Sequence, residues 1–268
     1  MPALVTLTTD FGLSDPFVGV MKGVILARLP EATIVDLTHG IPPQDLMAGC
    51  FWLSVSHGAF PAGTVHVAVV DPGVGTARHA LVARAGGHLF VAPDNGLLGP
   101  LLHDPASELR TVAPETLQRL GLSRSATFDG RDVFAPVGAE LAAGRLRLED
   151  VGPEARPVVS SALPPARISP QKVVGVVAVI DRFGNIISNI PAAALTMAHL
   201  KAPLVCVGKQ QLGLSRTYAE AGPMEYLALV NSFGHVEVAR ASGDAASALG
   251  VISGTAVVVV ETPPQGTN

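Results

Sequence analysis

A buried strand that ends abruptly dominates the first half of the chain. The stretch Val67 to Arg78 reads V-A-V-V-D-P-G-V-G-T-A-R, so four apolar residues lead into Asp71, and Pro72 and Gly73 then break the strand. A carboxylate and a guanidinium, those of Asp71 and Arg78, therefore share one loop at the carboxyl end of a strand. Open α/β sheets bind ligands at that edge. The loop indicates either a ligand site or a turn closed by a structural ion pair.

The preceding residues repeat the order strand, helix, strand. A helical pattern begins at Pro16 and a second is expected over Gln44–Ser56, opened by Pro42 and Pro43. The strand patterns that alternate with these helices are Leu4–Thr8, Thr33–Leu37 and Val65–Val70. A βαβαβ order implies a mostly parallel sheet with helices on its faces.

After the central loop, Ala80–Ala85 and His88–Ala92 read as two strands joined at Gly86 and Gly87. Asp94 and Asn95 in P-D-N-G are typical turn formers. Further on, Asp132 is expected to be the N-cap of a helix over Val133–Ala143.

A segment rich in proline separates this part from one of different character. We predict an N-terminal α/β domain over residues 1–152, a linker over 153–171 and a smaller β domain over 172–268. The last of these is an antiparallel barrel or sandwich, because short β-rich runs alternate there with Gly, Ser and Asn. These runs are Val173–Ile180, Leu204–Val207, Tyr226–Val230, Val236–Ala239 and Thr255–Val260, with helices expected over Pro191–Ala198 and Asp244–Leu249.

The composition is that of a well-packed globular protein. Hydrophobic residues make up 48% of the 268 residues and charged residues 15%, with a formal net charge of -4 and a pI near 6.0. The absence of a basic run argues against nucleic acid as a partner. The sequence lacks a signal-peptide pattern and an apolar run long enough for a membrane span, so we expect a cytoplasmic protein. Cys50 and Cys206 are expected to be small buried hydrophobic residues.

Several loops at strand ends carry carboxylates, and these could hold Mg²⁺ in a metal phosphohydrolase. Arg78 and Arg131 lie next to these carboxylates and would oppose a cation, so no metal is expected. The sequence has no Walker lysine, no G-x-S-x-G elbow and no kinase motifs to accompany D-F-G at Asp10–Gly12.

Seven motifs in order resemble the S-adenosyl-L-methionine (SAM) hydroxide adenosyltransferase family, the relatives of the fluorinating and chlorinating enzymes. The resemblance covers nearly the whole chain. The motifs are T-T-D-F-G (8–12), P-F-V-G-V-M-K-G (16–23), V-D-P-G-V-G-T (70–76), A-P-D-N-G-L-L (92–98), F-D-G-R-D-V-F-A-P (128–136), I-D-R-F-G-N-I-I-S-N (180–189) and V-N-S-F-G-H (230–235).

The resemblance implies hydrolysis of SAM to adenosine and L-methionine, by attack of water or hydroxide at the ribose C5′. The leaving group is a neutral thioether that needs no acid, so the enzyme must chiefly align and activate water. The resemblance places Asp71 and Arg78 among the three residues that align and activate the attacking water. The third of these residues is usually histidine, in F-H-G-R-D, but here it is Asp129.

Three consequences of this departure stay open. Asp129 replaces the histidine as a base, or it pairs with Arg78 or Arg131 and activity falls, or the change inactivates the enzyme. We expect reduced but real hydrolysis. His79 is expected to be a surface or turn residue rather than a substitute for the histidine.

The resemblance also implies the substrate-binding residues. Taken alone, Asp10, Asp181 and Asn185 have an ordinary alternative role as turn caps, and Phe183 and Tyr218 have one as core residues. The implied roles are Asp10 for the ribose hydroxyls, Asn185 for the adenine edge, Phe183 and Tyr218 for the aromatic wall, Asp181 for the methionine ammonium, Ser232 for its carboxylate and Arg240 near the base. A homotrimer with sites between subunits and no cofactor besides the substrate is implied as well.

Two other functions stay open. A halogenase would form 5′-halo-adenosine, but its relatives carry an aromatic residue in place of Asp71, whose charge would repel halide. A protein that binds adenosine or SAM without turnover is the other alternative, because of Asp129.

Overall fold

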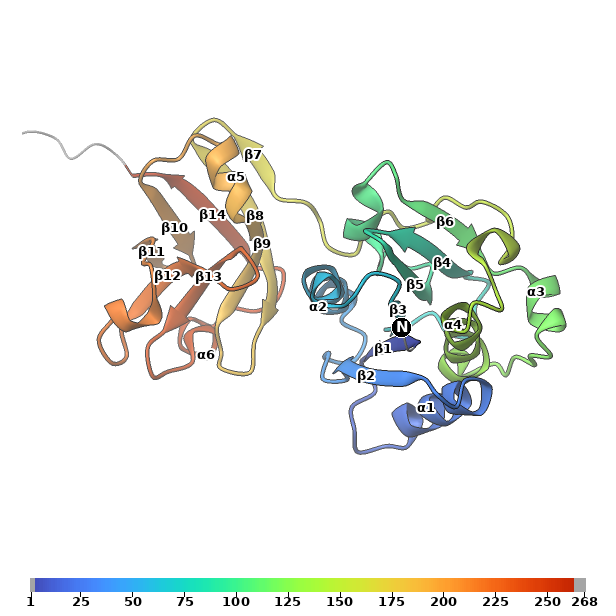
Figure 1. Cartoon of the computed structure of the whole chain (residues 1–268). Helices are drawn as coiled ribbons and strands as arrows, with labels where there is room; N and C mark the ends of the chain where they lie inside the picture. Colours follow the sequence, from blue (N-terminus) through green and yellow to red (C-terminus); the bar gives the residue numbers. More distant parts are fainter. Residues whose placement is uncertain (1–2, 263–268) are drawn as a thin grey trace, which may run out of the picture. The chain divides into compact units, whose positions relative to one another are not determined.

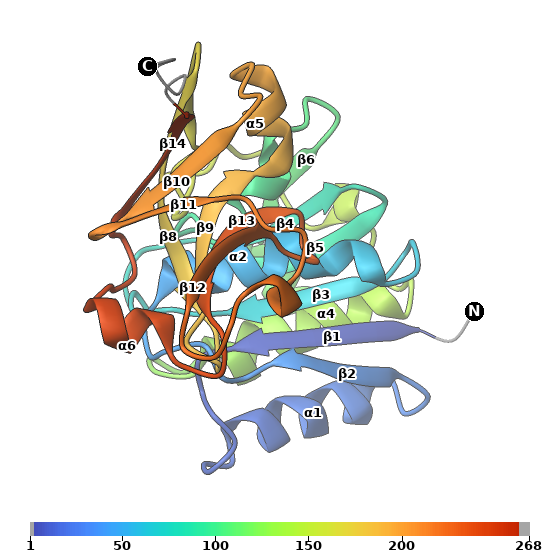
Figure 2. The ribbon, with the colours of Figure 1, turned by 90° about the vertical axis from the view of Figure 1, so that its left-hand side faces the viewer.

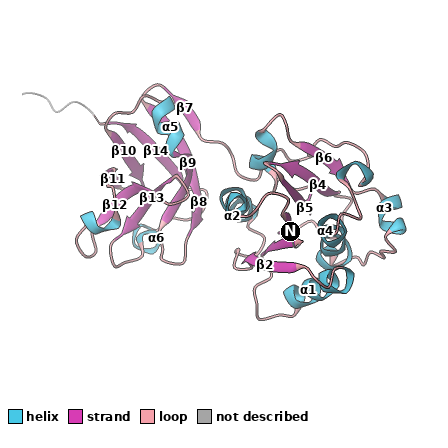
Figure 3. Cartoon of the chain, viewed as in Figure 1, coloured by secondary structure: helices cyan, strands magenta, loops and turns pink. Residues whose placement is uncertain are grey.

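The computed structural model describes residues 3–262, which form two compact units, the first ending at Leu163 and the second beginning at Pro164. The first unit mixes helices with strands, and the second consists mainly of strands (Figure 3). The fold class expected from the sequence, an α/β domain followed by an antiparallel barrel-like domain, is confirmed.

One six-stranded sheet organises the first unit, in the order β2-β1-β3-β5-β4-β6. Parallel pairing joins β1 to β2, β1 to β3 and β3 to β5, whereas β4 and β6 are antiparallel to their neighbours. The strands are β1 (Leu4–Thr9), β2 (Thr33–Thr38), β3 (Val65–Val69), β4 (Ala80–Ala85), β5 (His88–Pro93) and β6 (Glu108–Thr111). The sheet is therefore mostly parallel, as the βαβαβ pattern predicts.

Helices cover both faces of this sheet. Helices α1 (Phe17–Arg28) and α4 (Ala135–Ala142) pack together on one side, and α2 (Leu46–Ser56) lies on the other (Figures 1 and 2). A short helix, α3 (Pro114–Arg119), follows β6. Strand β3 is a nearly continuous apolar run because it is buried on both faces, whereas the edge strand β2 is partly exposed.

Two expected helix starts are wrong. The second helix begins at Leu46 rather than Gln44, because Gln44 has a φ of +66° and the Asp45 side chain caps the helix by accepting from Ala48 N at 2.9 Å. The helix expected from Val133 is preceded by η3 (Gly130–Phe134), a single π-helical turn. Asp132 lies inside that turn and is not an N-cap.

The second unit is an antiparallel sheet in the order β11-β10-β14-β8-β9-β13-β12. A bridge between Leu214, just after β11, and Ala228 in β12 links its two ends, so the sheet is nearly closed. Its strands are β7 (Arg167–Ser169), which pairs with β8 off this path, β8 (Lys172–Ile180), β9 (Ile186–Pro191), β10 (Pro203–Val207), β11 (Gln210–Gly213), β12 (Tyr226–Val230), β13 (His235–Arg240) and β14 (Ala256–Glu261).

The second unit also contains two short helices, α5 (Ala192–Met197) and α6 (Ala245–Leu249). The barrel interior is filled by residues that alternate along the strands, such as Val236 and Val238 of β13. Glu237 lies between them and so faces outward.

The expected linker is hydrogen-bonded rather than free of contacts. Ala155 N donates to Leu109 O in the first unit, and β7 pairs with β8 in the second. The domain boundaries at 152 and 172 stay a prediction.

Within residues 3–262, no helix combines the length and the apolar character that crossing a membrane requires. Cys50 is buried and Cys206 is only partly buried, which corrects the expectation for Cys206, and neither forms a disulfide.

Candidate active site

Loops from neighbouring parallel strands bring two of the expected residues to one edge of the first sheet. Asp10 follows β1 and Asp71 follows β3, and β1 and β3 pair in parallel, so both carboxylates lie at the carboxyl edge. The Asp10 carboxylate accepts from Gln44 N at 2.8 Å, in the loop after β2. The positive φ of Gln44 turns the chain there.

Asp71 and Arg78 form a bidentate ion pair across their shared loop. Arg78 Nε donates to Asp71 Oδ1 at 2.8 Å, and Arg78 Nη2 donates to Asp71 Oδ2. The loop is tight, since Val74 N donates to Asp71 O and Gly75 has a φ of +81°. The side chains of Arg78 and Asp71 are only 9% and 5% exposed, so this pair is largely desolvated.

Asp129 joins the same cluster from the residue before η3. Its side chain is 1% exposed, and its Oδ2 accepts from Arg78 Nη2 at 2.5 Å. A second guanidinium, that of Arg124, holds Asp129 in a bidentate pair, with Nε and Nη2 each 2.6 Å from a carboxylate oxygen. The pairing of Asp129 with Arg78 is thus present. Arg131 does not pair with Asp129 and binds Asp132 instead.

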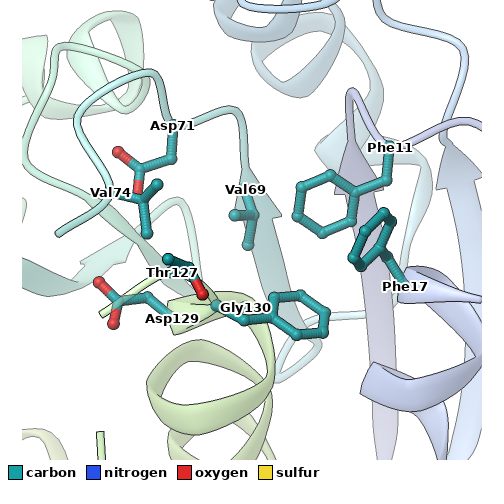
Figure 4. Close-up of a pocket in the computed structure, with 9 residues that line it drawn as sticks. Phe11, Phe17, Val69, Asp71, Val74, Thr127, Asp129 and Gly130 are labelled. Atoms are coloured by element: carbon teal, nitrogen blue, oxygen red, sulfur yellow. The ribbon is translucent and has the colours of Figure 1, made fainter. Parts of the chain in front are cut away.

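A cavity of about 160 Å³ opens beside the two carboxylates. Figure 4 shows Asp71 and Asp129 on one side of it and the rings of Phe11 and Phe17 on the other. The remaining lining residues are Val69, Val74, Thr127, Phe128 and Gly130. The cavity is therefore largely apolar apart from the carboxylates and Thr127, and interactions between charges are strong in such surroundings.

The ion cluster contains two carboxylates and two guanidinium groups, so its formal charge is zero. Hydrogen bonds to Asp129 raise the pKa of Arg124, and the charges of Asp129 and Asp71 add to that rise. His79 is exposed and offers only its backbone carbonyl, to Arg78 Nη1 and Asp94 N. Its imidazole does not take the place of the family histidine.

In the second unit, the turn between β8 and β9 is organised by Asp181. Its Oδ1 accepts from Phe183 N and Asn185 N at 2.8 and 2.9 Å, and its Oδ2 accepts from Asn185 Nδ2 at 2.9 Å. The phenyl ring of Phe183 is 78% exposed. Asp181 thus acts as a turn cap. Phe183, within this turn, is largely exposed.

Tyr218, which is itself exposed, belongs to a polar cluster around the buried Glu237 on the outer face of β13. Its hydroxyl donates to Glu237 Oε1 at 2.6 Å, and Asn231 Nδ2 donates to Glu237 Oε2 at 3.1 Å. Burial raises the pKa of Glu237, which is 2% exposed, and the charge of Asp181 raises it further. Burial and the neighbouring Glu237 also raise the pKa of Tyr218.

Ser232 lies exposed in the turn between β12 and β13. Arg240 ends β13 and lies over the ring of Tyr226, 5.2 Å from its centroid, while its Nε donates to Met224 O at 3.0 Å. The structure thus brings Asp71, Arg78 and Asp129 together in one unit, with Asp10 at the same sheet edge. The remaining expected residues all belong to the other unit.

Sequence reasoning missed Arg124 and Glu237. Arg124 lies in an irregular loop, five residues before Asp129, and neither a motif nor a periodic pattern marks it. Glu237 alternates with apolar residues as an ordinary outward-facing strand position does. The missed signal for Glu237 is a carboxylate opposite Ile187, an apolar cross-strand partner.

Among the described residues, no group of three or more His, Cys, Asp or Glu side chains could hold a metal ion. That no metal or cofactor takes part stays a prediction.

The first unit thus combines a mostly parallel sheet, covered by helices on both faces, with a buried Asp–Arg–Asp cluster beside a largely apolar cavity, and the second unit is a nearly closed barrel. The chain matches the SAM hydroxide adenosyltransferase N-terminal domain over residues 5–152 and the C-terminal domain of the same family over residues 175–258. The chain belongs to the SAM hydroxide adenosyltransferase family, which the sequence motifs predict.

Its relatives include both hydrolases and halogenating enzymes. It is 41% identical to the (R)-S-adenosyl-L-methionine hydrolase of Salinispora tropica, over 93% of this chain and 95% of the relative. It is 27% identical to the fluorinase of Nocardia brasiliensis, over 96% of each. A crystal structure of an uncharacterized conserved protein from Thermotoga maritima superposes with a TM-score of 0.85 at 33% identity, covering 96% of this chain and all of the other.

Proposed function

We propose that this protein hydrolyses SAM to adenosine and L-methionine. The observation that carries the proposal is the buried cluster of Asp71, Arg78 and Asp129 beside the apolar cavity. The name of the Salinispora tropica relative supports the substrate and favours its (R) sulfonium epimer.

In the proposed reaction, a water molecule held by Asp71 and Arg78 attacks the ribose C5′. A C–O bond forms, the C–S bond breaks, and its electron pair returns to sulfur, so that the sulfonium leaves as the neutral thioether of methionine. The water proton passes to Asp71 and then to solvent. Arg78 stabilises the hydroxide-like character that develops on the attacking oxygen.

The apolar lining supports this reaction. The partial negative charge on the attacking oxygen and the positive charge of the sulfonium cancel on the way to the transition state. Surroundings such as Phe11, Phe17 and Val69 penalise separated charges more than the neutralised products. A cavity of this kind therefore lowers the free energy of the transition state relative to that of the separated, charged reactants.

The same cavity argues against halide as the nucleophile. Asp71 and Asp129 both line it, and their charges would repel fluoride or chloride. Formation of 5′-halo-5′-deoxyadenosine in the presence of halide would contradict this.

The substrate-binding residues extend the proposal to an assembly. Asp10 would bind the ribose hydroxyls, and Asp181, Phe183, Asn185, Tyr218, Ser232 and Arg240 would bind the base and the methionine. The division of these residues between two units supports sites shared between subunits of a homotrimer. The unpaired thiols of Cys50 and Cys206 support the cytoplasm as its location.

The test is product analysis in water enriched in ¹⁸O. The purified protein is incubated with each sulfonium epimer of SAM, and adenosine and methionine are measured by mass spectrometry. We expect ¹⁸O in the 5′-hydroxyl of adenosine, because water attacks C5′. Bound nucleoside without turnover would instead identify a binding protein.

A further inference from the structure

We infer that Arg124 is a positioning residue for hydrolysis, and that it acts as the partner that lets a carboxylate occupy the position of the family histidine. The inference rests on the proposed hydrolysis and concerns its ion cluster. It starts from the most buried side chain there, that of Asp129, which is 1% exposed.

A buried carboxylate needs compensating donors, and Arg78 cannot supply enough of them. Arg78 already gives Nε and Nη2 to Asp71, and only a shared Nη2 contact reaches Asp129. Without Arg124, two carboxylates would compete for one guanidinium at the cavity wall. Arg124 removes that competition because it supplies its own Nε and Nη2 to Asp129, both at 2.6 Å.

The loop that carries Arg124 is held in place on both sides. Leu122 N donates to Leu117 O at 2.9 Å, and Ser125 N donates to Asp132 Oδ2 at 2.8 Å. The guanidinium therefore does not have to be ordered when substrate binds. The Arg124 guanidinium binds Asp129 and has no bond to Asp71, so we place its effect on Asp129 and, through it, on Arg78 rather than on the substrate.

The charge balance explains why Asp129 and Arg124 depend on each other. With Asp129, the cluster has two negative and two positive groups. A neutral histidine at 129 would leave Arg78 and Arg124 facing a single carboxylate, that of Asp71. We therefore expect histidine at this position to function better without the Arg124 charge, and Asp129 to function better with it.

The first test compares Arg124→Ala with the unaltered protein. The variant gains one net negative charge beside the cavity, which disfavours loss of a proton from the attacking water but attracts the sulfonium. We expect kcat to fall about 10-fold or more, KM not to rise, and the rising limb of the kcat–pH profile to move to higher pH. If Arg124 had only a structural role, Arg124→Ala would lower the thermal midpoint of unfolding without moving the rising limb of the kcat–pH profile.

A conservative variant, chemical rescue and a control variant test the same role of Arg124. Arg124→Lys keeps the charge but loses the bidentate geometry, so we expect an intermediate kcat. Because the Arg124 side chain is 39% exposed and lines a second cavity of about 370 Å³, added methylguanidine should restore part of the activity of Arg124→Ala. Arg147→Ala, which breaks an exposed pair with Asp150, is the matched control and should leave kcat unchanged.

The second test is a double-mutant cycle of four proteins: the unaltered chain, Asp129→His, Arg124→Gln and the variant that carries both substitutions. We expect Asp129→His to be less active than the unaltered chain, and Asp129→His with Arg124→Gln to be about 10-fold more active than Asp129→His alone, since the uncompensated charge is then removed.

The outcomes separate the two proposals. If the unaltered chain forms no adenosine, the proposed hydrolysis falls and the inference falls with it. If the unaltered chain forms adenosine but Arg124→Ala keeps its kcat and pH profile, or the two substitutions of the cycle are additive, the inference alone is overturned.

Discussion

Two acidic residues at the cavity bind the same arginine but differ in their other hydrogen-bond partners. Asp71 has a single guanidinium partner and lies at the end of β3, where a substrate can approach. Asp129 accepts three hydrogen bonds from two guanidinium groups, so its lone pairs are largely occupied. We therefore propose that Asp71 accepts the proton of the attacking water and that Asp129 mainly orients Arg78.

At this scale we predict that Asp71→Asn lowers kcat about 100-fold or more. The amide keeps the shape of the side chain but cannot accept a proton from water, and general-base catalysis typically contributes such a factor. The measurement is adenosine release at saturating SAM. Asp150→Asn, in an exposed pair with Arg147, serves as the control. A kcat within about twofold of the unaltered chain would assign the base to another group.

At the scale of elements, the active-site loop after β3 depends on close backbone approach. Gly75 has a φ of +81°, and a Cβ placed there would lie 2.6 Å from Ala126 O. The loop that carries Asp71 and Arg78 is thus in direct contact with the segment that leads to Asp129. The two loops hold each other in register, which places the three charged groups in one cluster.

We predict that Gly75→Ala lowers both stability and kcat. Gly63→Ala is a matched control, because Gly63 has a similar φ of +86° but no atom within 4 Å of an added Cβ. The control should lose about 1–2 kcal/mol of unfolding free energy from backbone strain alone. Gly75→Ala should lose more, and only this variant should lose activity. Urea denaturation and adenosine release measure the two effects, and equal losses in both variants would contradict the contact argument.

At the scale of the whole molecule, the edge of the first sheet opposite the active site holds a buried histidine cluster. His66, near the start of β3, bonds Thr6 Oγ1 through Nδ1 at 2.7 Å and His88 through Nε2 at 3.3 Å, and it stacks on Phe90. Burial, together with the charges of His88 and His57, lowers the pKa of His66 to about 3. The buried position of His66 therefore favours the folded state only while its imidazole is neutral.

We predict that acid destabilises the protein through His66. The unfolded chain binds a proton near pH 6.5, whereas the folded chain resists it until about pH 3, so stability is present above pH 6.5 and is lost as the pH falls through that window. The slope is about 1.4 kcal/mol per pH unit for each such histidine.

Urea denaturation between neutral pH and the acid end of that window measures this slope. It should be shallower in His66→Gln than in His103→Gln, whose imidazole is exposed. Equal slopes in the two variants would show that His66 does not carry the effect.

The sequence by itself determined the features that depend on neighbouring residues. The Asp71–Arg78 loop, the Asp181 turn and the hairpin of β4 and β5 follow from a few positions of Gly, Pro and Asp, because short segments leave the backbone few conformations. The apolar and alternating patterns likewise determined the two kinds of sheet.

Only the tertiary structure decided which charges meet. Arg78 and Asp129 are 51 residues apart, and Tyr218 and Glu237 are joined by the packing of an irregular segment over β13. Arg124 is near Asp129 in sequence, yet its loop has no regular period that would aim the side chain. Such contacts depend on how whole elements pack, and a buried charge finds its partner only after that packing places the partner within reach.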